Sequence, residues 1–387
     1  MMKKLIVFFD GTWNREDQFD RASGQPSPTN ITKLFEATLP ADTQDHAQIV
    51  HYVRGIGTKR TERLRGGGFG QGISANIMEG YRFLVSNYVA GDEIFIFGFS
   101  RGAYTARSLA GMIRNCGILK REKMHLIHEA FDNYKNRTPD WNPSASNAVD
   151  FRQAHTWGNE TIKFLGVFDT VGALGAPFGI AMSWIAEKVW QIKFHDTQIS
   201  SIIENAYHAV AVDEHRLPFQ PTLMEPNTRH NPSNFEQKWF PGVHSNIGGG
   251  YDCTGLSDLA LAWMADKAGA HGLNLDLSRI SNPVFNPNVL ETPKKSLTLG
   301  YCLLSVLFVK LPGAFGLVLE KYKNALPNLT WTGKYIRPIP DKGDVQPFIG
   351  NPPAQPVQNY TGSLDSSVIE KINNPDQKYR PRNVVDK

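Results

Sequence analysis

Short apolar runs of strand length recur along this chain, and their spacing limits the fold more than any other feature. The runs are Leu5–Phe9, Gln48–Val53, Ile94–Gly98, Ile162–Phe168, Ala209–Val212 and Lys238–Val243. The stretches between them are long enough for crossover helices, and we expect helices at 74–88, 102–113 and 257–268. Apolar strands that alternate with helices are typical of a parallel sheet covered on both faces. The sequence therefore predicts an α/β fold with a mostly parallel central sheet.

Composition agrees with a globular protein and excludes several classes. Of the 387 residues, 41% are hydrophobic and 20% charged, which allows a sizeable core. A net charge of +4 is too small a surplus to indicate nucleic-acid binding. The three cysteines (Cys116, Cys253 and Cys302) lie far apart, which argues against a disulfide framework and a cysteine-rich zinc site.

Two apolar segments bear on targeting. The run after Lys4 ends at Asp10, before it reaches the length of a signal peptide, so we expect no leader and a cytoplasmic protein as synthesised. The stretch 297–319 is interrupted by Lys310, Pro312 and two glycines, which does not favour a membrane span.

The strongest functional signal is the segment Glu93–Ala103, where an apolar strand runs into Gly98-Phe99-Ser100-Arg101-Gly102 and then a helical stretch. A serine between two glycines on such a turn is typical of a nucleophile elbow, because side chains at the glycine positions would collide. The helix N-terminus that follows favours a developing oxyanion. This pattern predicts Ser100 as a nucleophile, with a simple tight turn as the alternative.

A serine nucleophile needs a histidine base, and the base needs an orienting carboxylate. In α/β-hydrolases these residues follow the serine in the order acid, then histidine. Asp169 ends the run 162–168, and His244 follows another apolar run and precedes three glycines. We predict Asp169 as the acid and His244 as the base; a turn acid and a packed loop histidine are the alternatives.

Other acids and histidines are weaker candidates. Asp213 follows a short strand but stands in a charged cluster that we expect to support the site. Asp252, Asp258 and His51 break the expected order, and His208 and His215 lack the glycine-rich context.

The segment Asp10-Gly11-Thr12 after the first strand predicts an oxyanion-hole turn. There the N–H of Gly11 or Thr12 joins that of Arg101, and Asp10 holds the loop in place. A haloacid-dehalogenase-type phosphotransferase would need an aspartate where this chain has Phe8, so that chemistry is excluded. A structural turn is the remaining alternative.

The glycine-rich run 65–73 lacks the Walker lysine and the Gly-x-Gly-x-x-Gly register, so we expect a flexible loop beside the site. No metal site or cofactor is expected, because no set of ligands at suitable spacing stands out.

Together these motifs resemble the α/β-hydrolase domain of type VI secretion phospholipase effectors. The matching segments are Phe9–Thr12, Arg54–Thr58, Gly91–Glu93, Gly98–Ala103, Phe168–Val171, Asp213–Glu214, His244–Tyr251, 366–368 and 379–381. In that family the matching serine, aspartate and histidine form the triad, which implies these roles for Ser100, Asp169 and His244. The resemblance also implies export by a type VI secretion system and a secretion-apparatus or immunity-protein partner.

One position departs from the family. The family commonly has aspartate after His-Ser, whereas this chain has Asn246. A neutral side chain there is expected to shift the pH optimum and leave the triad in place.

The expected function is that of a serine hydrolase that cleaves carboxylic (acyl) esters through an acyl-enzyme. Phospholipids are the expected substrates, with contact to a membrane surface and none to nucleic acid. A soluble-ester esterase, a thioesterase, a non-catalytic binding module, and a membrane-acting interaction protein whose apolar segments matter more than its serine are the alternatives.

The chain is expected to divide into an α/β-hydrolase catalytic domain at 1–290 and a C-terminal extension at 291–387 packed on it. Proline becomes frequent from about residue 270, and a short helix is expected at 366–372. Residues 176–195, after the acid strand, carry Trp184 and Trp190 among other apolar side chains, with Lys188 nearby, which predicts a lipid-binding lid. An ordinary core helix is the alternative, and 299–319 is expected to form the opposite wall of an acyl channel.

Overall fold

A single parallel sheet organises the part of the chain that the computed structural model describes, which is residues 2–20, 23–57, 68–136, 138–172, 198–216, 219–226, 235–294 and 363–374. Its strand order is β2-β1-β3-β4-β5-β6-β7, and every neighbouring pair is parallel. The strands are β1 (Lys4–Phe9), β2 (Gln48–Val53), β3 (Glu93–Phe99), β4 (Phe164–Phe168), β5 (Ala206–Ala211), β6 (Phe235–Phe240) and β7 (Ser363–Leu364). This architecture confirms the predicted α/β-hydrolase-like fold class.

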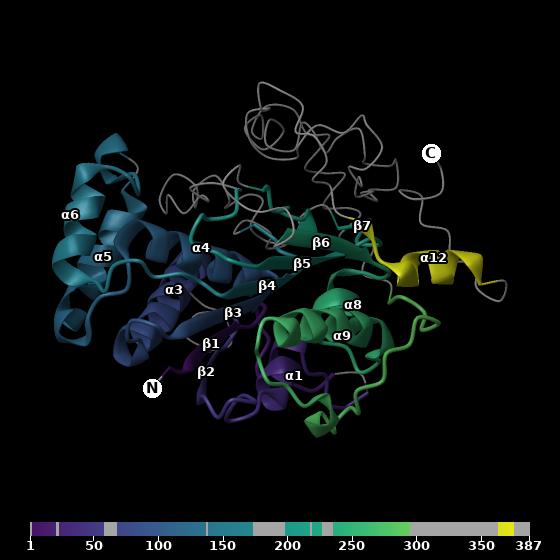
Figure 1. Cartoon of the computed structure of the whole chain (residues 1–387). Helices are drawn as coiled ribbons and strands as arrows, with labels where there is room; N and C mark the ends of the chain where they lie inside the picture. Colours follow the sequence, from purple (N-terminus) through teal and green to yellow (C-terminus); the bar gives the residue numbers. More distant parts are fainter. Residues whose placement is uncertain are drawn as a thin grey trace, which may run out of the picture.

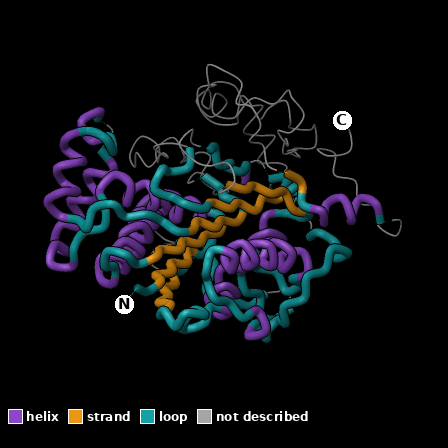
Figure 2. The backbone as a smooth tube through the Cα atoms, in the orientation of Figure 1, coloured by secondary structure: helices purple, strands orange, loops and turns teal. Residues whose placement is uncertain are grey.

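Helices cover both faces of the sheet (Figure 1). They are α1 (Asn30–Ala37), α3 (Gly68–Asn87), α4 (Arg101–Cys116), α5 (Ile127–Lys135), α6 (Ser146–His155), α8 (His244–Gly248), α9 (Gly255–Ala270) and α12 (Ser366–Asn373), with 3₁₀ turns at Arg121–Leu126, Pro139–Trp141 and Leu277–Arg279. The backbone trace shows α3 and α4 on one side of the strands and α1 and α9 on the other (Figure 2).

Alternate residues of each central strand serve the two cores. In β1, Leu5, Val7 and Phe9 pack with residues of α3 and α4. Ile6 and Phe8 point the other way and pack with residues of α1 and α9. A strand buried on both faces has no polar positions to alternate, which is why these runs are apolar throughout.

The first four predicted strands have nearly their observed bounds, whereas the last two are displaced. β5 begins three residues before the predicted start, and β6 spans Phe235–Phe240 instead of 238–243. Gly242 has a φ of +114° and turns the chain out of the sheet, so the predicted strand end at Val243 is wrong. His244 is consequently the first residue of helix α8 and does not lie in a loop.

Helix α3 corrects a second expectation. It begins at Gly68, inside the glycine-rich run that was predicted to be a loop. At Gly72 a β-carbon would lie 2.5 Å from Cγ2 of Ile56, so close packing of the helix requires glycine there. Tertiary contact thus overrides the low helix propensity of glycine.

The C-terminal part of the chain completes one edge of the sheet. β7 pairs with β6 at Ser363 and Leu364, and the Asp365 side chain caps α12 by accepting the N–H of Ser367 at 2.9 Å. The predicted helix at 366–372 is confirmed. The proposed lid at 176–195 and the apolar stretch at 299–319 lie outside the described residues, and the domain boundary near 290 stays a prediction. None of the described helices combines the length and apolar character needed to cross a membrane.

Candidate active site

The sheet topology brings the predicted site residues to one edge. β1 connects outward to β2, and the chain then returns to place β3 on the other side of β1. Such a reversal opens a crevice at the carboxyl ends of the two strands. Asp10 directly follows β1 and Ser100 directly follows β3, so both residues lie at the strand ends where this reversal occurs.

Ser100 occupies a strained turn between β3 and α4. Its φ is +58° and its ψ −122°, which is unusual for a residue with a side chain. A β-carbon at Gly102 would lie 2.2 Å from the carbonyl oxygen of Phe9, and one at Gly98 would lie 2.6 Å from Cα of Ala103. The two glycines of the motif therefore let the turn pack directly on β1 and on α4.

Strand register places the acid beside the serine. Phe99 pairs with Phe168, so Ser100 and Asp169 follow at the same level of neighbouring strands. The Ser100 N–H donates to the carbonyl oxygen of Phe168 at 3.1 Å, which ties the two turns together. Asp169 is fully buried and has a φ of +37°.

His244 joins Ser100 and Asp169 in one chain of hydrogen bonds. Its Nε2 lies 2.8 Å from the Ser100 Oγ, and its Nδ1 lies 2.6 Å from Asp169 Oδ2. A carboxylate can only accept, so Nδ1 carries the proton and Nε2 is left to accept from the serine hydroxyl. The other carboxylate oxygen accepts the N–H of Ala211 at 3.0 Å, which fixes the orientation of Asp169.

Aromatic rings enclose the imidazole. Phe99 and Phe219 have ring centroids 4.7 Å and 5.0 Å from that of His244. This burial lowers the pKa of His244 below its ordinary value of 6.5, while the bond to Asp169 opposes the shift. A histidine held neutral in this way is suited to accept a proton.

Glu214, in the charged cluster that was expected to support the site, holds the backbone of His244. Its buried carboxylate accepts the His244 N–H at 3.2 Å and the N–H, Nε and Nη2 donors of Arg216 at 2.8–2.9 Å. The Arg216 guanidinium lies 3.6 Å from the ring centroid of Phe219. One residue earlier, Asp213 accepts the N–H of Gly242 at 2.6 Å and so supports the turn before α8.

Asp10 lies beneath the loop that was predicted to hold the oxyanion. It accepts the N–H of Gly11 at 2.6 Å and the Thr29 hydroxyl at 2.9 Å, and the Tyr52 hydroxyl also donates to it. Burial raises the pKa of Asp10 to about 6. The N–H and hydroxyl of Thr12 meet no hydrogen-bond partner among the described residues. The N–H of Thr12 is therefore available to bind an oxyanion, whereas that of Gly11 is not. Arg101, at the start of α4, lies 5.8 Å from the ring of Trp13 in the same loop.

The weaker candidates take structural positions. Asp258 forms a fully buried ion pair with Lys33 at 2.6 Å, and Asp252 pairs with Lys294 at 3.2 Å. His208 accepts the N–H of Thr170 and so holds the turn after Asp169. His51, on β2, stacks on the ring of Phe83 in α3.

Asn246, the residue that departs from the family pattern, lies in the first turn of α8. Its Oδ1 accepts the N–H of Val243 at 3.2 Å and that of Lys294 at 3.4 Å. Its Nδ2 is buried and meets no partner within the described ranges. A carboxylate could accept the same two donors, which explains why either residue type suits the position.

A family model settles the relationship that the motifs suggested. Residues 3–267 match the type VI secretion system phospholipase effector Tle1-like catalytic domain. The chain belongs to this family. The match confirms the resemblance to type VI secretion phospholipase effectors.

Individual relatives are more distant. A Saccharomyces cerevisiae protein described as uncharacterized, YEL023C, is 30% identical over 246 residues, which are 58% of this chain and 33% of that protein. An uncharacterized protein from Pseudomonas aeruginosa shares 18% identity with a TM-score of 0.46, over 85% of this chain and 53% of that one. The Tle1 effector bound to the VgrG spike shares 20% identity with a TM-score of 0.34, over 65% of this chain and 51% of that one. The chain thus spans about a third of the curated relative and about half of each of these two structures.

Proposed function

We propose that this protein is a serine hydrolase that cleaves the acyl esters of phospholipids. The observation that carries the proposal is the buried chain of hydrogen bonds from Asp169 through His244 to Ser100. It lies at the N-terminus of α4, where backbone donors favour negative charge.

In the proposed reaction, Ser100 Oγ attacks the acyl carbonyl while His244 Nε2 takes its proton. Asp169 holds the Nδ1–H and stabilises the positive imidazolium. The same Nε2–H then protonates the leaving alcohol as the carbon–oxygen bond breaks, which leaves an acyl group on Ser100. Water, activated by the neutral His244, hydrolyses that ester and restores the serine.

The oxyanion of the tetrahedral intermediate would be bound by the N–H groups of Arg101 and Thr12. The first N–H groups of a helix have no acceptor within the helix, and Arg101 opens α4. The N–H of Gly11 already donates to Asp10, which supports Thr12 as the second donor and Asp10 as the residue that shapes the loop.

Phospholipid as substrate rests on the family, whose description names a phospholipase effector. The direct test is release of fatty acid from defined phospholipid vesicles, with Ser100→Ala as the inactive control. Covalent labelling of the wild type by a fluorophosphonate, absent in Ser100→Ala, tests the nucleophile separately. Labelling without any ester hydrolysis would contradict the proposed function.

We further propose type VI export and contact with a secretion apparatus, on the strength of the family description alone. Secretion of the protein that depends on a functional type VI system would support this. Equal release from cells that lack the system would contradict it.

A further inference from the structure

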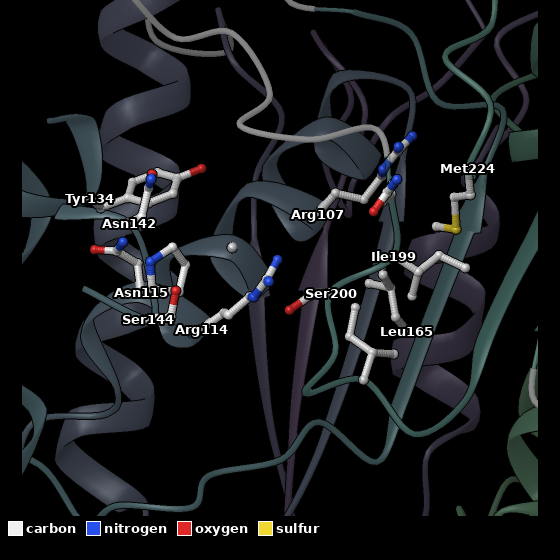
Figure 3. Close-up of a pocket in the computed structure, with 14 residues that line it drawn as sticks. Arg107, Arg114, Asn115, Tyr134, Asn142, Ser144, Leu165, Ile199, Ser200 and Met224 are labelled. Carbon is white, nitrogen blue, oxygen red and sulfur yellow. The ribbon is translucent and has the colours of Figure 1, made fainter. Parts of the chain in front are cut away.

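A polar cavity lies between α4, α5 and the start of β4, away from the edge that carries Ser100. It has a volume of about 340 Å³ and is lined by fourteen described residues, which Figure 3 shows as sticks. On α4 the lining residues are Arg107, Gly111, Arg114 and Asn115, at the i, i+4, i+7 and i+8 spacing of one helix face. None of Ser100, Asp169 and His244 is among the described lining residues. Along α4, Arg107 follows Ser100 by seven residues, or about 10 Å, and Arg114 follows it by fourteen, or about 21 Å. The cavity is therefore separate from the proposed active site.

The charge of this cavity is positive. The fourteen described lining residues include two arginines and no acidic residue. Glu225, which directly follows the lining residue Met224, interacts electrostatically with Arg107 but not with Arg114 in any described contact. Arg107 donates to the carbonyl oxygens of Thr222 and Leu223 at 2.6 Å and 3.2 Å, which fixes its side chain. Burial lowers the pKa of Arg107 to about 10, so it stays protonated at neutral pH.

Arg114 is the cation with donors to spare. Its side chain forms no hydrogen bond or ion pair within the described part of the chain. Glu160 lines an adjoining hollow that also includes Arg114, but its Oε1 accepts the N–H groups of Ile118 and Trp157. A partly buried guanidinium without a carboxylate partner suits a bound anion.

The cavity has a polar wall and an apolar wall on opposite sides of the two arginines. Tyr134, Asn142 and Ser144 lie on one side of the arginines in Figure 3, and Leu165, Ile199 and Met224 lie on the other. Gly111 leaves room between them, because a β-carbon there would have only ordinary contacts of 3.5 Å with the Tyr134 ring. The lining thus offers donors for an anion and an apolar surface for an organic group.

We propose that this cavity binds an organic phosphate, with its anionic group on Arg107 and Arg114 and its organic part against Leu165, Ile199 and Met224. Two guanidinium groups with nearby hydroxyl and amide donors suit the three terminal oxygens of a phosphate ester better than the two of a carboxylate. The volume exceeds that of inorganic phosphate and lies within the range of small-molecule sites. The ligand could be a soluble phosphate ester or a phospholipid head group, which share this chemistry.

Calorimetric titration with hexyl phosphate tests the site on the full chain. Hexyl phosphate should bind, and hexanoate and inorganic phosphate should each bind at least about tenfold more weakly, since each lacks one half of the recognised chemistry. Equal binding of hexanoate would overturn the phosphate assignment. Equal binding of inorganic phosphate would overturn the role of the apolar wall.

Matched variants place the ligand in the cavity. Arg114→Gln should weaken hexyl phosphate binding about tenfold or more, and Gly111→Leu should abolish it by filling the space. Arg82→Gln, the same change on an exposed part of α3, should leave binding unchanged. Equal losses in Arg114→Gln and Arg82→Gln would overturn the site, because they would reflect net charge alone. Hydrolysis of a short soluble ester should be unchanged in Arg114→Gln, and it reports on folding independently of the cavity.

A second measurement separates the two sources of phosphate. The Ser100→Ala protein, which cannot hydrolyse lipid, and the double variant that also carries Arg114→Gln are each mixed with phosphatidylcholine vesicles that contain phosphatidic acid. Flotation then compares how much of each protein binds to the vesicles. A loss of vesicle binding with Arg114→Gln would support a lipid head group as ligand. If Arg114→Gln loses hexyl phosphate binding but still binds the vesicles, the ligand is a soluble phosphate ester. Absence of hexyl phosphate binding to the wild type would overturn the proposal whether or not the protein hydrolyses esters.

Discussion

Asparagine in place of Asp169 tests the proposed mechanism with almost no change of shape. In the structure, one carboxylate oxygen meets His244 Nδ1 at 2.6 Å and the other accepts the Ala211 N–H at 3.0 Å. An amide has only one acceptor oxygen. The Ala211 N–H requires that oxygen, because a flipped amide would leave two buried donors facing each other.

The asparagine NH₂ therefore has to face His244 Nδ1. That nitrogen must then accept, so the imidazole proton moves to Nε2 and points at Ser100. His244 can no longer take the serine proton, and the negative charge that stabilises the imidazolium is also lost. We expect kcat to fall by about 10⁴, which corresponds to about 5.5 kcal/mol of transition-state stabilisation.

Asp213→Asn is the matched control. Asp213 accepts the N–H of Gly242, which an amide oxygen does equally well, so kcat should change by less than about threefold. Initial rates on a soluble acyl ester and on phospholipid vesicles, with melting temperatures for both variants, complete the comparison. Near-normal turnover in Asp169→Asn together with a large loss in Asp213→Asn would refute the assignment of the acid.

Further predictions concern the surroundings of the site. Glu214→Gln keeps an acceptor for the His244 N–H but removes the charge, so kcat should fall about tenfold or more while KM changes little. If kcat and the pH profile stay unchanged, the role of this carboxylate is purely structural. The acid limb of kcat/KM should lie below pH 6.5, because burial lowers the pKa of His244 and only the neutral form accepts a proton; a limb above that value contradicts this. Lys33→Met leaves the Asp258 carboxylate buried without its cation, so the free energy of unfolding measured by urea denaturation should fall by about 3–5 kcal/mol. A decrease below about 1 kcal/mol would show that water or another group replaces the lysine. Gly102→Ala places a methyl group 2.2 Å from a backbone oxygen of β1, so melting temperature and activity should both fall, whereas Ala at exposed Gly269, where a β-carbon meets nothing within 4 Å, should be tolerated.

The position that departs from the family gives one more test. Asn246→Asp adds a negative charge two residues after His244 and should move the acid limb to higher pH, because the charge favours the imidazolium. A limb that stays in place would show that the side chain acts only as a helix cap.

The local sequence determined the parts of this protein that depend on nearest neighbours along the chain. The apolar run at 94–98 and the two glycines around Ser100 are sufficient to predict a strand, a tight turn and a helix, since a bulkier residue at either glycine position would collide with backbone. Strands buried on both faces carry a continuous apolar pattern, so their number and alternation with helices predicted the fold class.

Only the tertiary structure decided which distant groups meet. The pairing of Asp169 with His244 depends on strand register and on the turn at Gly242, and no local pattern sets either. Helix α3 begins among glycines because the packing of Gly72 against Ile56 outweighs propensity. Glu214 contributes to the site because its carboxylate accepts the N–H of His244, thirty residues later in the chain. The cavity at Arg114 is likewise formed by elements that become neighbours only in the folded chain. Contacts across the sheet and between its layers form between residues far apart in sequence, and a linear pattern carries the residue types but not the geometry that brings them together.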